Sequence, residues 1–391
     1  MAVEMEKLIQ KYPGSDLKLL AGEKGIHAQV TWVHVSELPN PGSFLKGGEL
    51  VIMTCVCIDK KNPEEWLTSQ LASIRQAKAS GVILNVGEYL PEIPGICIDF
   101  CEKYDFPLFS LGWSTDLQEV TRPLCSYIIQ ENEREHTISN AFKNAIFFPD
   151  RQDLYVVPLS DYHFEPGDRY AVCTLSIGNP SSEPYQEAGE LVQEIRARLK
   201  YRQKKASVFT ADKEIVVVLC SDSSDEVHRT AEDLFSHLRQ SLSGGENLFA
   251  GVGKLTKSVR CIYKSYRQAS SIRTLQERRS VALTDCFYDN LGIYGLLLGI
   301  EDEDIKKDYV SRILGPLLDY DRKKGSDLTG AVRLYLKNGG SIQDTASELF
   351  IHKNTVTYRI NLASQILHID LSTLNGKMQV QLALLIHDMD A

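Results

Sequence analysis

The sequence lacks the features that mark membrane and secreted proteins. No apolar run approaches the ~20 residues that a membrane helix needs, and the most apolar stretch, IVVVLC at 215–220, has the length of a strand. The first residues, MAVEMEKLIQKYPG, do not place a basic segment before an apolar one, so no signal peptide is expected. The nine cysteines are odd in number and have no disulfide-like spacing, which favours reduced thiols. We therefore expect a cytoplasmic protein without membrane contact.

An excess of positive charge is also missing. Lysine and arginine number 43 against 52 acidic residues, a formal net charge of −9, which excludes a protein that coats nucleic acid by charge alone. The charge is unevenly spread, however. Residues 322–391 hold eight basic and six acidic residues, or +2, which leaves −11 for the rest of the chain. Contact with DNA is thus permitted at the carboxyl-terminal end.

The length of 391 residues corresponds to two or three domains at roughly 150 residues each. Near the amino terminus, short apolar segments alternate with amphipathic ones. The apolar segments predict strands at 50–54, 81–87 and 107–112, and the amphipathic ones predict helices at 63–80 and 93–105. Strands that alternate with helices in this way indicate a mostly parallel sheet with helices packed on it.

The remaining chain predicts three further parts. Residues 126–148 form one amphipathic connecting helix that ends before Pro149. A second α/β block covers 168–288 and includes two strands around a turn at 211–213, and from about 290 only helical patterns remain. The expected fold class is therefore multidomain, with two α/β domains and an all-α carboxyl-terminal domain. The expected boundaries are 1–125, a linker at 126–149, 150–288 and 289–391.

The stretch TASELFIHKNTVTYRI at 345–360 predicts two short helices joined by a tight turn, with a helix-turn-helix at about 341–363. Ser341 is placed to cap the first helix and His352 the second. Because each residue of a helix advances by about 100°, Val356, Ile360 and Ala363 share a narrow arc of the second helix. That arc is expected to pack on the first helix.

The opposite face of the second helix carries amides, hydroxyls and cations, and no carboxylate lies between residues 353 and 369. Phosphates repel carboxylates, and base edges are bound by Asn, Lys, Arg and Thr. This pattern favours a DNA-recognition helix, whereas an ordinary helical hairpin is the alternative. Bases are contacted mainly by the amino-terminal residues of such a helix. The candidate DNA-binding residues are His352, Lys353, Asn354, Thr355, Thr357, Tyr358 and Arg359.

These residues also carry a resemblance. The pattern TAxxLFxHxNTxxYR, met from Thr345 to Arg359, resembles the helix-turn-helix of the purine catabolism regulator (PucR/CdaR-like) transcription factors. Residues 32–54 resemble the amino-terminal domain of that family, and the middle of the chain resembles its degenerate cyclase-like domain. The resemblance implies an α/β sensor domain, a degenerate GGDEF-like domain and a helical DNA-binding domain.

The function that the resemblance implies is a metabolite-responsive DNA-binding transcriptional regulator of catabolic genes, of purine or amino-acid type. Its partners would be double-stranded DNA, a second copy of the chain in a homodimer or higher oligomer, and a small-molecule effector. The alternative is a metabolite-binding or nucleotide-signalling protein whose helix-turn-helix serves oligomerisation.

The stretch SGGENLFAGVG at 243–253 is similar to a diguanylate cyclase signature but lies in the wrong place. The signature belongs in the turn of the central hairpin, which here reads TADKE at 210–214 and has no glycine. The end of the first strand of this block, SIGN at 176–179, also has no metal-binding carboxylate. We therefore expect no enzyme activity and no cofactor.

An effector site is expected in the amino-terminal domain, because ligands of α/β sheets bind beyond the carboxyl ends of parallel strands. The residues at these ends are Thr54, Asn85, Gly87 and Trp113; the alternative is that they only turn and cap the sheet. Two cysteine pairs, at 55/57 and 97/101, are compatible with a metal site. Because free cysteine is a common small core residue, we expect core thiols and no metal.

Overall fold

The computed structural model describes residues 2–178, 187–242, 247–278, 281–300 and 302–390. The chain forms two compact units. The first unit runs to Asn144 and also contains Arg151–Phe164 and Glu187–Ser207, and the second unit contains the rest of the described chain. Among the described residues, no helix has both the length and the apolar character that a bilayer crossing requires.

A five-stranded sheet forms the centre of the first unit. Its strand order is β2 (Lys18–Ala21), β7 (Leu108–Gly112), β6 (Gly81–Val86), β5 (Glu49–Met53) and β4 (Trp32–Ser36). β4, β5, β6 and β7 are parallel, and only β2 is antiparallel. The predicted mostly parallel sheet is therefore confirmed. Near the amino terminus, β1 (Val3–Glu4) pairs with β3 (Gln29–Val30), and two 3-10 helices, η1 (Glu23–His27) and η2 (Pro41–Phe44), flank β3 and β4.

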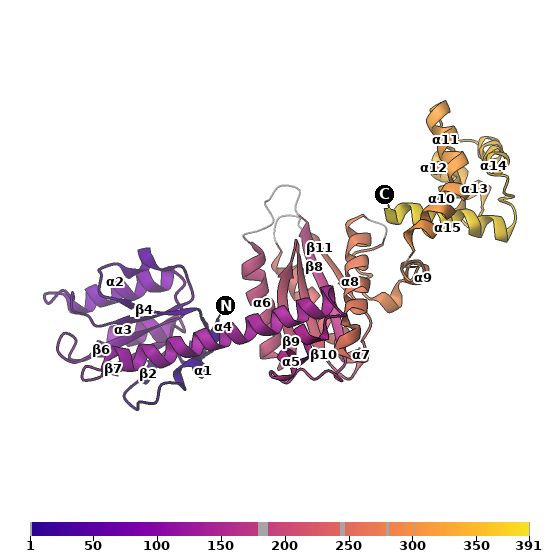
Figure 1. Ribbon diagram of the computed structural model, residues 1–391. Coiled ribbons are helices and arrows are strands. Elements are labelled where there is room, and N and C mark those ends of the chain that lie inside the picture. Colours follow the sequence, from indigo (N-terminus) through magenta and orange to yellow (C-terminus); the bar gives the residue numbers. More distant parts are fainter. Residues whose placement is uncertain (1, 179–186, 243–246, 279–280, 301, 391) are drawn as a thin grey trace. The chain divides into compact units, whose positions relative to one another are not determined.

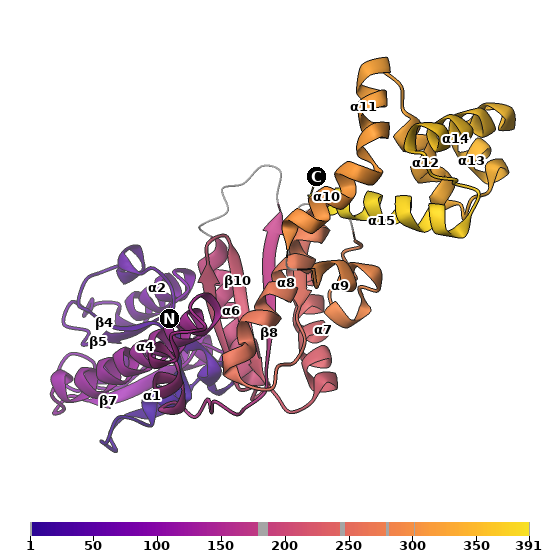
Figure 2. The ribbon, with the colours of Figure 1, turned by 45° about the vertical axis from the view of Figure 1, so that its right-hand side comes forward.

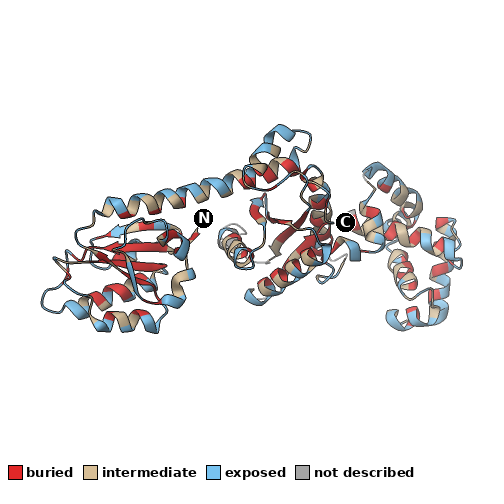
Figure 3. Cartoon of the chain, turned by 90° about the horizontal axis from the view of Figure 1, so that it is seen from below, coloured by how far each residue is buried: buried red, intermediate tan, exposed pale blue. Residues whose placement is uncertain are grey.

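Helices cover both faces of this sheet because both faces are apolar (Figures 1 and 3). Successive residues of a strand point to opposite faces. Val51 and Leu84 accordingly pack in the cluster of α2 (Pro63–Gln76) and α3 (Gly95–Lys103). Leu50 and Ile83 pack instead in the cluster of α1 (Met5–Ile9) and α4 (Leu117–Phe147). Continuous apolar runs are typical of strands that are buried on both faces.

The connecting helix α4 is longer than predicted. It begins at Leu117 rather than at residue 126, and Pro123 lies inside it. The prediction was wrong at this end because a proline disfavours a helix interior, whereas Val120, Leu124 and Ile128 are completely buried at helical spacing against the sheet. Packing of that face outweighs the local preference. The helix ends before Pro149, as expected.

Three helical segments of the first unit follow α4 in the chain. These segments are η3 (Gln152–Leu154), α5 (Val156–Ser160) and α6 (Glu187–Tyr201). Arg196 of α6 pairs with Glu135 of α4 at 2.9 Å, and the rings of Phe142 and Phe164 meet edge to face at 5.1 Å.

Three of the cysteines belong to the core of the first unit. Cys55, Cys97 and Cys101 are buried in the cluster of α2 and α3. Burial raises the pKa of all three thiols, and that of Cys55 and Cys101 to about 12. They are therefore protonated thiols at neutral pH and act as small apolar residues.

Apart from the first two residues of β9, the second unit contains a four-stranded sheet in the order β11 (Asn247–Val252), β8 (Tyr170–Gly178), β10 (Glu214–Cys220) and β9 (Ala206–Ala211). β8 is antiparallel to both β10 and β11. The expected turn between β9 and β10 is present at residues 212–213. α8 (Ile262–Glu277), which follows η4 (Val259–Cys261), is tied to the sheet, because the Ser265 hydroxyl accepts from the Val172 amide at 2.9 Å. α7 (Ser224–Ser241) buries Leu234 and Phe235.

A buried ion network joins β10 to α8. The Arg273 guanidinium donates to Glu214, which is 6% exposed, at 3.0 Å, and it also pairs with Glu277. The Tyr266 hydroxyl donates to Glu214, and the Ser176 hydroxyl at the end of β8 donates to Glu277 at 2.7 Å. Arg273 is therefore the cation that compensates two carboxylates at this end of the sheet.

From η5 (Tyr288–Asn290) onward the described chain contains helices and no strand, as predicted. They are α9 (Ile293–Leu298), α10 (Glu303–Ile313), α11 (Gly315–Lys324), α12 (Leu328–Lys337), α13 (Ile342–Leu349), α14 (Lys353–Leu367) and α15 (Leu374–Asp390). The expected fold class, two α/β parts and an all-α part, is confirmed. Residues from α11 to α15 share one apolar core, which includes Leu317, Val332, Val356 and Leu384.

Helix α15 takes part in two clusters. Val380 and Ala383 belong to the core just described, whereas Ile386 and Met389 pack with Leu275 of α8 and with α9. A two-pronged ion pair between Arg333 of α12 and Asp388 of α15 lies close to this junction, with Nη2 to Oδ1 at 2.9 Å.

Removal of Arg273 should destabilise the second unit strongly. Arg273→Leu leaves Glu214 buried without its cation, and breaking a buried pair in this way costs about 3–5 kcal/mol. The measurement is urea unfolding. Arg267→Leu, an exposed position on the same helix, is the matched control and should change stability by less than about 0.5 kcal/mol. Equal effects of the two variants would contradict the assignment, and Glu214→Leu/Arg273→Leu should recover part of the loss.

A second stability prediction concerns Asp321 of α11, which accepts hydrogen bonds from the amides of Leu328 and Thr329, both at 2.8 Å. Burial raises the pKa of Asp321, but these bonds and one from Ser326 outweigh burial and hold it below the ordinary value. Asp321→Ala should cost about 1–2 kcal/mol, the usual value of a lost cap. Because a lowered carboxyl pKa stabilises the fold only while the group is ionised, the difference from wild type should shrink as the pH falls below about 4.

The control for this prediction is Asp319→Ala. Asp319 lies on the same helix, is exposed and makes a 3.6 Å pair with Arg322, so its loss should be nearly neutral. A difference between Asp321→Ala and wild type that stays constant down to pH 3 would rule out the ionised carboxylate as the cause.

Candidate nucleic-acid interface

The first helix of the predicted helix-turn-helix is α13. The Ser341 hydroxyl accepts from the Asp344 amide at 3.2 Å, which confirms the predicted cap. Ala346 is buried in the core of α11–α15, and its small side chain belongs to the same cluster as Val356 of α14.

His352 caps the second helix, α14, as predicted. Nδ1 of His352 accepts from the Asn354 amide at 3.2 Å. The neutral ring therefore carries its proton on Nε2, so the exposed ring has one N–H donor left for a ligand. The open amide groups and dipole of this helix terminus also favour an anion such as a phosphate.

One face of α14 is buried. Val356 and Ala363 are completely buried, and Ile360 is 5% exposed, in the core that they share with α12, α13 and α15. Figure 2 shows α12, α13 and α14 gathered together. The predicted packing face is confirmed, and it fixes which side of α14 faces outward.

The outward face carries the predicted candidates. Arg359 is half-buried, and the other six are exposed, namely His352, Lys353, Asn354, Thr355, Thr357 and Tyr358. Tyr358 is 66% exposed, which no packing requirement of the core explains. The Thr357 hydroxyl donates to the Lys353 carbonyl at 3.1 Å, so its methyl group and oxygen lone pairs remain available to a ligand.

A carboxylate of the neighbouring helix is held by partners. Glu348 of α13 pairs with Lys337 at 2.7 Å and accepts from the Asn338 side-chain amide at 3.0 Å. The hydrogen bond from Lys337 is the main cause that holds the pKa of Glu348 below its usual range. α14 itself has no acidic residue between Lys353 and Leu367, so its exposed face presents amides, hydroxyls and cations but no carboxylate.

Sequence reasoning missed one residue of this region. Phe350, in the turn between the helices, is 94% exposed and adopts the left-handed conformation with φ of 54°. The pattern places it in a turn but gives no sign of its exposure, because a phenylalanine beside a helix is usually expected to be buried.

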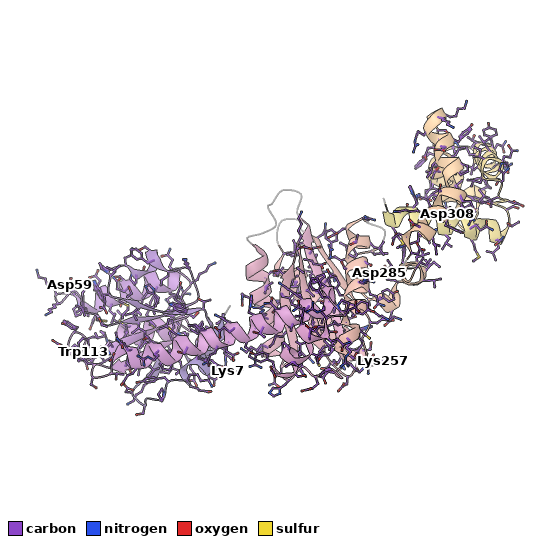
Figure 4. The ribbon with its side chains drawn as sticks, viewed as in Figure 1. Lys7, Asp59, Trp113, Lys257, Asp285 and Asp308 are labelled. Carbon is purple, nitrogen blue, oxygen red and sulfur yellow. The ribbon has the colours of Figure 1, made fainter. Side chains whose placement is uncertain are left out.

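The predicted effector residues lie at the carboxyl edge of the first sheet. The Asn85 side chain, 3% exposed, donates to the Gly112 carbonyl at 3.1 Å. Gly87 lies against Trp113, since a Cβ at Gly87 would come within 2.2 Å of the Trp113 Cβ. Figure 4 shows Trp113 and Asp59 at the end of the first unit that is opposite Lys7. The structure thus brings three of the predicted residues together.

Thr54, the fourth predicted residue, donates its hydroxyl to Glu37. A surface cavity of about 530 Å³ lies at the other, amino edge of the sheet, where Ser80 and Pro107 precede β6 and β7. Arg75, Lys78 and Asp105 supply its charged groups. An effector site at the carboxyl edge therefore stays a prediction.

Metal-ligand geometry occurs once among the described residues, where Glu4, Glu6 and His27 approach one another at the surface. Glu4 already pairs with Lys7 at 3.4 Å and with His27 at 2.8 Å, so these contacts are those of a surface ion-pair group.

The similarity to a cyclase signature at 243–253 lies partly outside the described residues, which resume at Asn247. The hairpin turn between β9 and β10 contains Asp212 and Lys213 and no glycine. At the end of β8, Ser176 contacts Glu277, and Arg273 neutralises this carboxylate and Glu214. A guanidinium therefore compensates the carboxylates near the strand end where a cyclase would hold a metal ion, so these residues do not fit such an ion.

Comparisons with known proteins agree with the three parts of the chain. The purine catabolism regulatory protein-like family matches residues 8–128, the GGDEF-like domain matches 159–274, and the PucR carboxyl-terminal helix-turn-helix domain matches 328–386.

Three curated relatives are from Bacillus subtilis. The proline-responsive transcriptional activator PutR is 27% identical over 56% of this chain and 53% of its own length. The DNA-binding transcriptional activator AdeR is 25% identical over 52% of this chain and 50% of its own length. The purine catabolism regulatory protein is 23% identical over 44% of this chain and 32% of its own length. The chain spans about half of the length of the first two relatives. With an amino-terminal domain, a middle domain and a helix-turn-helix of PucR type in this order, the chain belongs to the PucR family of transcriptional regulators.

Proposed function

We propose that this protein is a DNA-binding transcriptional regulator of catabolic genes. The observation that carries the proposal is α14, which is buried along Val356, Ile360 and Ala363 and presents an exposed face without carboxylates. PutR and AdeR are transcriptional activators, one of them responsive to proline, and a third relative is a purine catabolism regulatory protein. These relatives support a regulator whose target genes serve catabolism.

In this proposal the amino-terminal turn of α14 enters the major groove. Lys353, Asn354 and Thr357 contact base edges, because Lys binds guanine and Asn binds adenine in that groove. Tyr358 and Arg359 contact phosphates or the groove edge, and His352 and Thr355 complete the surface at the helix start. One helix of this length reads few base pairs, so two copies of the chain would bind paired half-sites as a homodimer or higher oligomer.

The middle domain has no catalytic role in this proposal. Its β9–β10 turn lacks glycine, and Arg273 neutralises the carboxylates near the end of β8. The domain would instead link the sensor to the DNA-binding helices. We propose the functional boundaries 1–125, 126–149, 150–288 and 289–391 for the sensor, linker, GGDEF-like and DNA-binding parts, acting in the cytoplasm.

The amino-terminal domain would respond to a small metabolite at the carboxyl edge of its sheet. Trp113, 37% exposed, offers a ring face beside Gly87 and meets Tyr89 edge to face at 5.2 Å. Thr54 and Asn85 are already hydrogen-bonded to protein groups, so their role would be to hold the shape of this edge rather than to contact the ligand.

The first test is selection of sheared genomic DNA by the purified full-length protein near physiological salt. Wild type should enrich a few fragments, and affinity for one of them should fall about ten- to hundredfold for Asn354→Ala and for Tyr358→Ala if each loses about 1–3 kcal/mol of contact. Affinity should also fall steeply with salt.

The matched control is Gln365→Ala, an exposed amide near the other end of α14, which should bind like wild type. If the Asn354 and Tyr358 variants assembled normally and bound as tightly as wild type, the helix-turn-helix would be an oligomerisation element instead.

A second test addresses the effector edge. In a thermal-shift screen with purines and amino acids, a metabolite that stabilises wild type should lose its effect on Trp113→Ala and keep it on Lys78→Ala, which alters the amino-edge cavity. The opposite pattern would move the effector site to that cavity.

A further inference from the structure

Helices α11 to α14 share one way of ending. In the Schellman motif the residue after the helix adopts the left-handed conformation, and the next amide bonds to a carbonyl five residues back; glycine is the usual residue there. α11 follows this rule with Gly325 at φ 61°, and α12 follows it with Gly339 at φ 64°. Their closing bonds run from Ser326 to the Asp321 carbonyl at 3.3 Å and from Gly340 to the Tyr335 carbonyl at 2.8 Å.

Helix α13 closes with the same bonds but without glycine. The Ile351 amide donates to the Ala346 carbonyl at 3.1 Å, and the Phe350 amide donates to the Ser347 carbonyl at 3.3 Å. The left-handed residue is Phe350, at φ 54° and ψ 40°. A side chain at this conformation costs free energy relative to glycine, so the backbone alone would favour glycine here.

Packing does not explain the phenylalanine either. Phe350 is 94% exposed, although its neighbours Leu349 and Ile351 both pack against the helical core. A single exposed apolar residue is common, but Phe350 combines exposure with a left-handed conformation that favours glycine. Neither packing nor the backbone therefore accounts for a phenylalanine at this position.

The position of Phe350 indicates which molecule. It lies two residues before His352, the cap of α14, and therefore at the end of the helix where Lys353 and Asn354 begin the outward face. In the major groove the apolar group of a base edge is the thymine C5-methyl, and a phenylalanine ring is one of the side chains that contact it.

We infer that Phe350 is a further DNA-contacting residue, whose ring packs on a thymine methyl group beside the bases read by α14. The inference rests on the proposed function. It adds an apolar, thymine-selective contact to a surface whose other candidates are polar or charged.

The chain supplies a matched control for the backbone. Helix α14 ends in the same motif, with the Ile369 amide donating to the Ser364 carbonyl at 3.2 Å and His368 as the left-handed residue at φ 54°. His368 is exposed, and it lies at the other end of α14, about 20 Å from the first turn at 1.5 Å per residue. Phe350→Gly and His368→Gly therefore relieve the same strain, but only the first removes the proposed contact.

The experiment uses full-length wild type, Phe350→Gly, His368→Gly and Asn354→Ala. For each protein we measure the affinity for one genomic fragment selected by wild type. The fragment is amplified in two forms, one containing thymidine and one containing deoxyuridine, which lacks the C5-methyl group. Wild type should bind the uridine fragment several-fold more weakly. Phe350→Gly should bind the thymidine fragment about tenfold more weakly than wild type, as for a lost buried apolar contact, and should lose most of the preference for thymidine.

His368→Gly should behave like wild type on both fragments, and neither glycine variant should lower the urea unfolding midpoint. The joint result, unchanged stability with weaker and methyl-insensitive binding, would support the inference, because a structural role for Phe350 would lower the midpoint.

Three results would overturn it. If Phe350→Gly bound both fragments like wild type, Phe350 would not contact DNA. The proposed function would still stand if Asn354→Ala weakened binding in the same assay. Loss of affinity with an unchanged preference for thymidine rejects the methyl contact. If Phe350→Gly bound both fragments as tightly as wild type but failed to activate a reporter gene, Phe350 would be assigned to a protein partner instead.

Discussion

The burial of one narrow side of α14 is the constraint on which the rest of the carboxyl-terminal region depends. Val356, Ile360 and Ala363 can face only the core formed with α12, α13 and α15. Because a helix has one rotation for a given buried face, this packing also decides that Asn354, Thr357 and Tyr358 face outward. The orientation of this outward face therefore follows from the apolar side chains that hold α14 in the core.

Charge is distributed so that the same surface stays available. The body of the chain is acidic, and α14 has no carboxylate of its own. On α13, Glu348 is tied to Lys337 and Asn338. In the middle sheet, Arg273 compensates Glu214 and Glu277, which turns the end of β8 from a site that would attract a cation into one that already contains a cation.

Much of this structure could be predicted from the sequence, because alternation and helical spacing are local signals. Three inner strands of the first sheet (β5, β6 and β7), the hairpin turn at Asp212 and the caps at Ser341 and His352 follow from residues near one another. The antiparallel edge strand β2 was not predicted. The start of α4 could not be predicted, because Pro123 argues locally against helix and only distant packing of Val120 overrides it. The exposure of Phe350 was equally hidden, since its sequence neighbours Leu349 and Ile351 pack against the core and solvent exposure is a property of the assembled fold.

Helix α15 has a consequence for the order in which the helical region folds during synthesis. The core beneath α14 includes Val380 and Ala383 of α15. Arg333 of α12 pairs with Asp388 of α15, which lies 55 residues later in the chain. A nascent chain that has released α13 and α14 but not α15 therefore lacks one wall of that core, and the apolar side of α14 has no complete partner. Since contacts between distant segments form only after both have been made, a chain without α15 cannot hold α14 in its final rotation. The orientation of α14 during translation therefore depends on the synthesis of α15, whose residues Val380 and Ala383 complete the core beneath it.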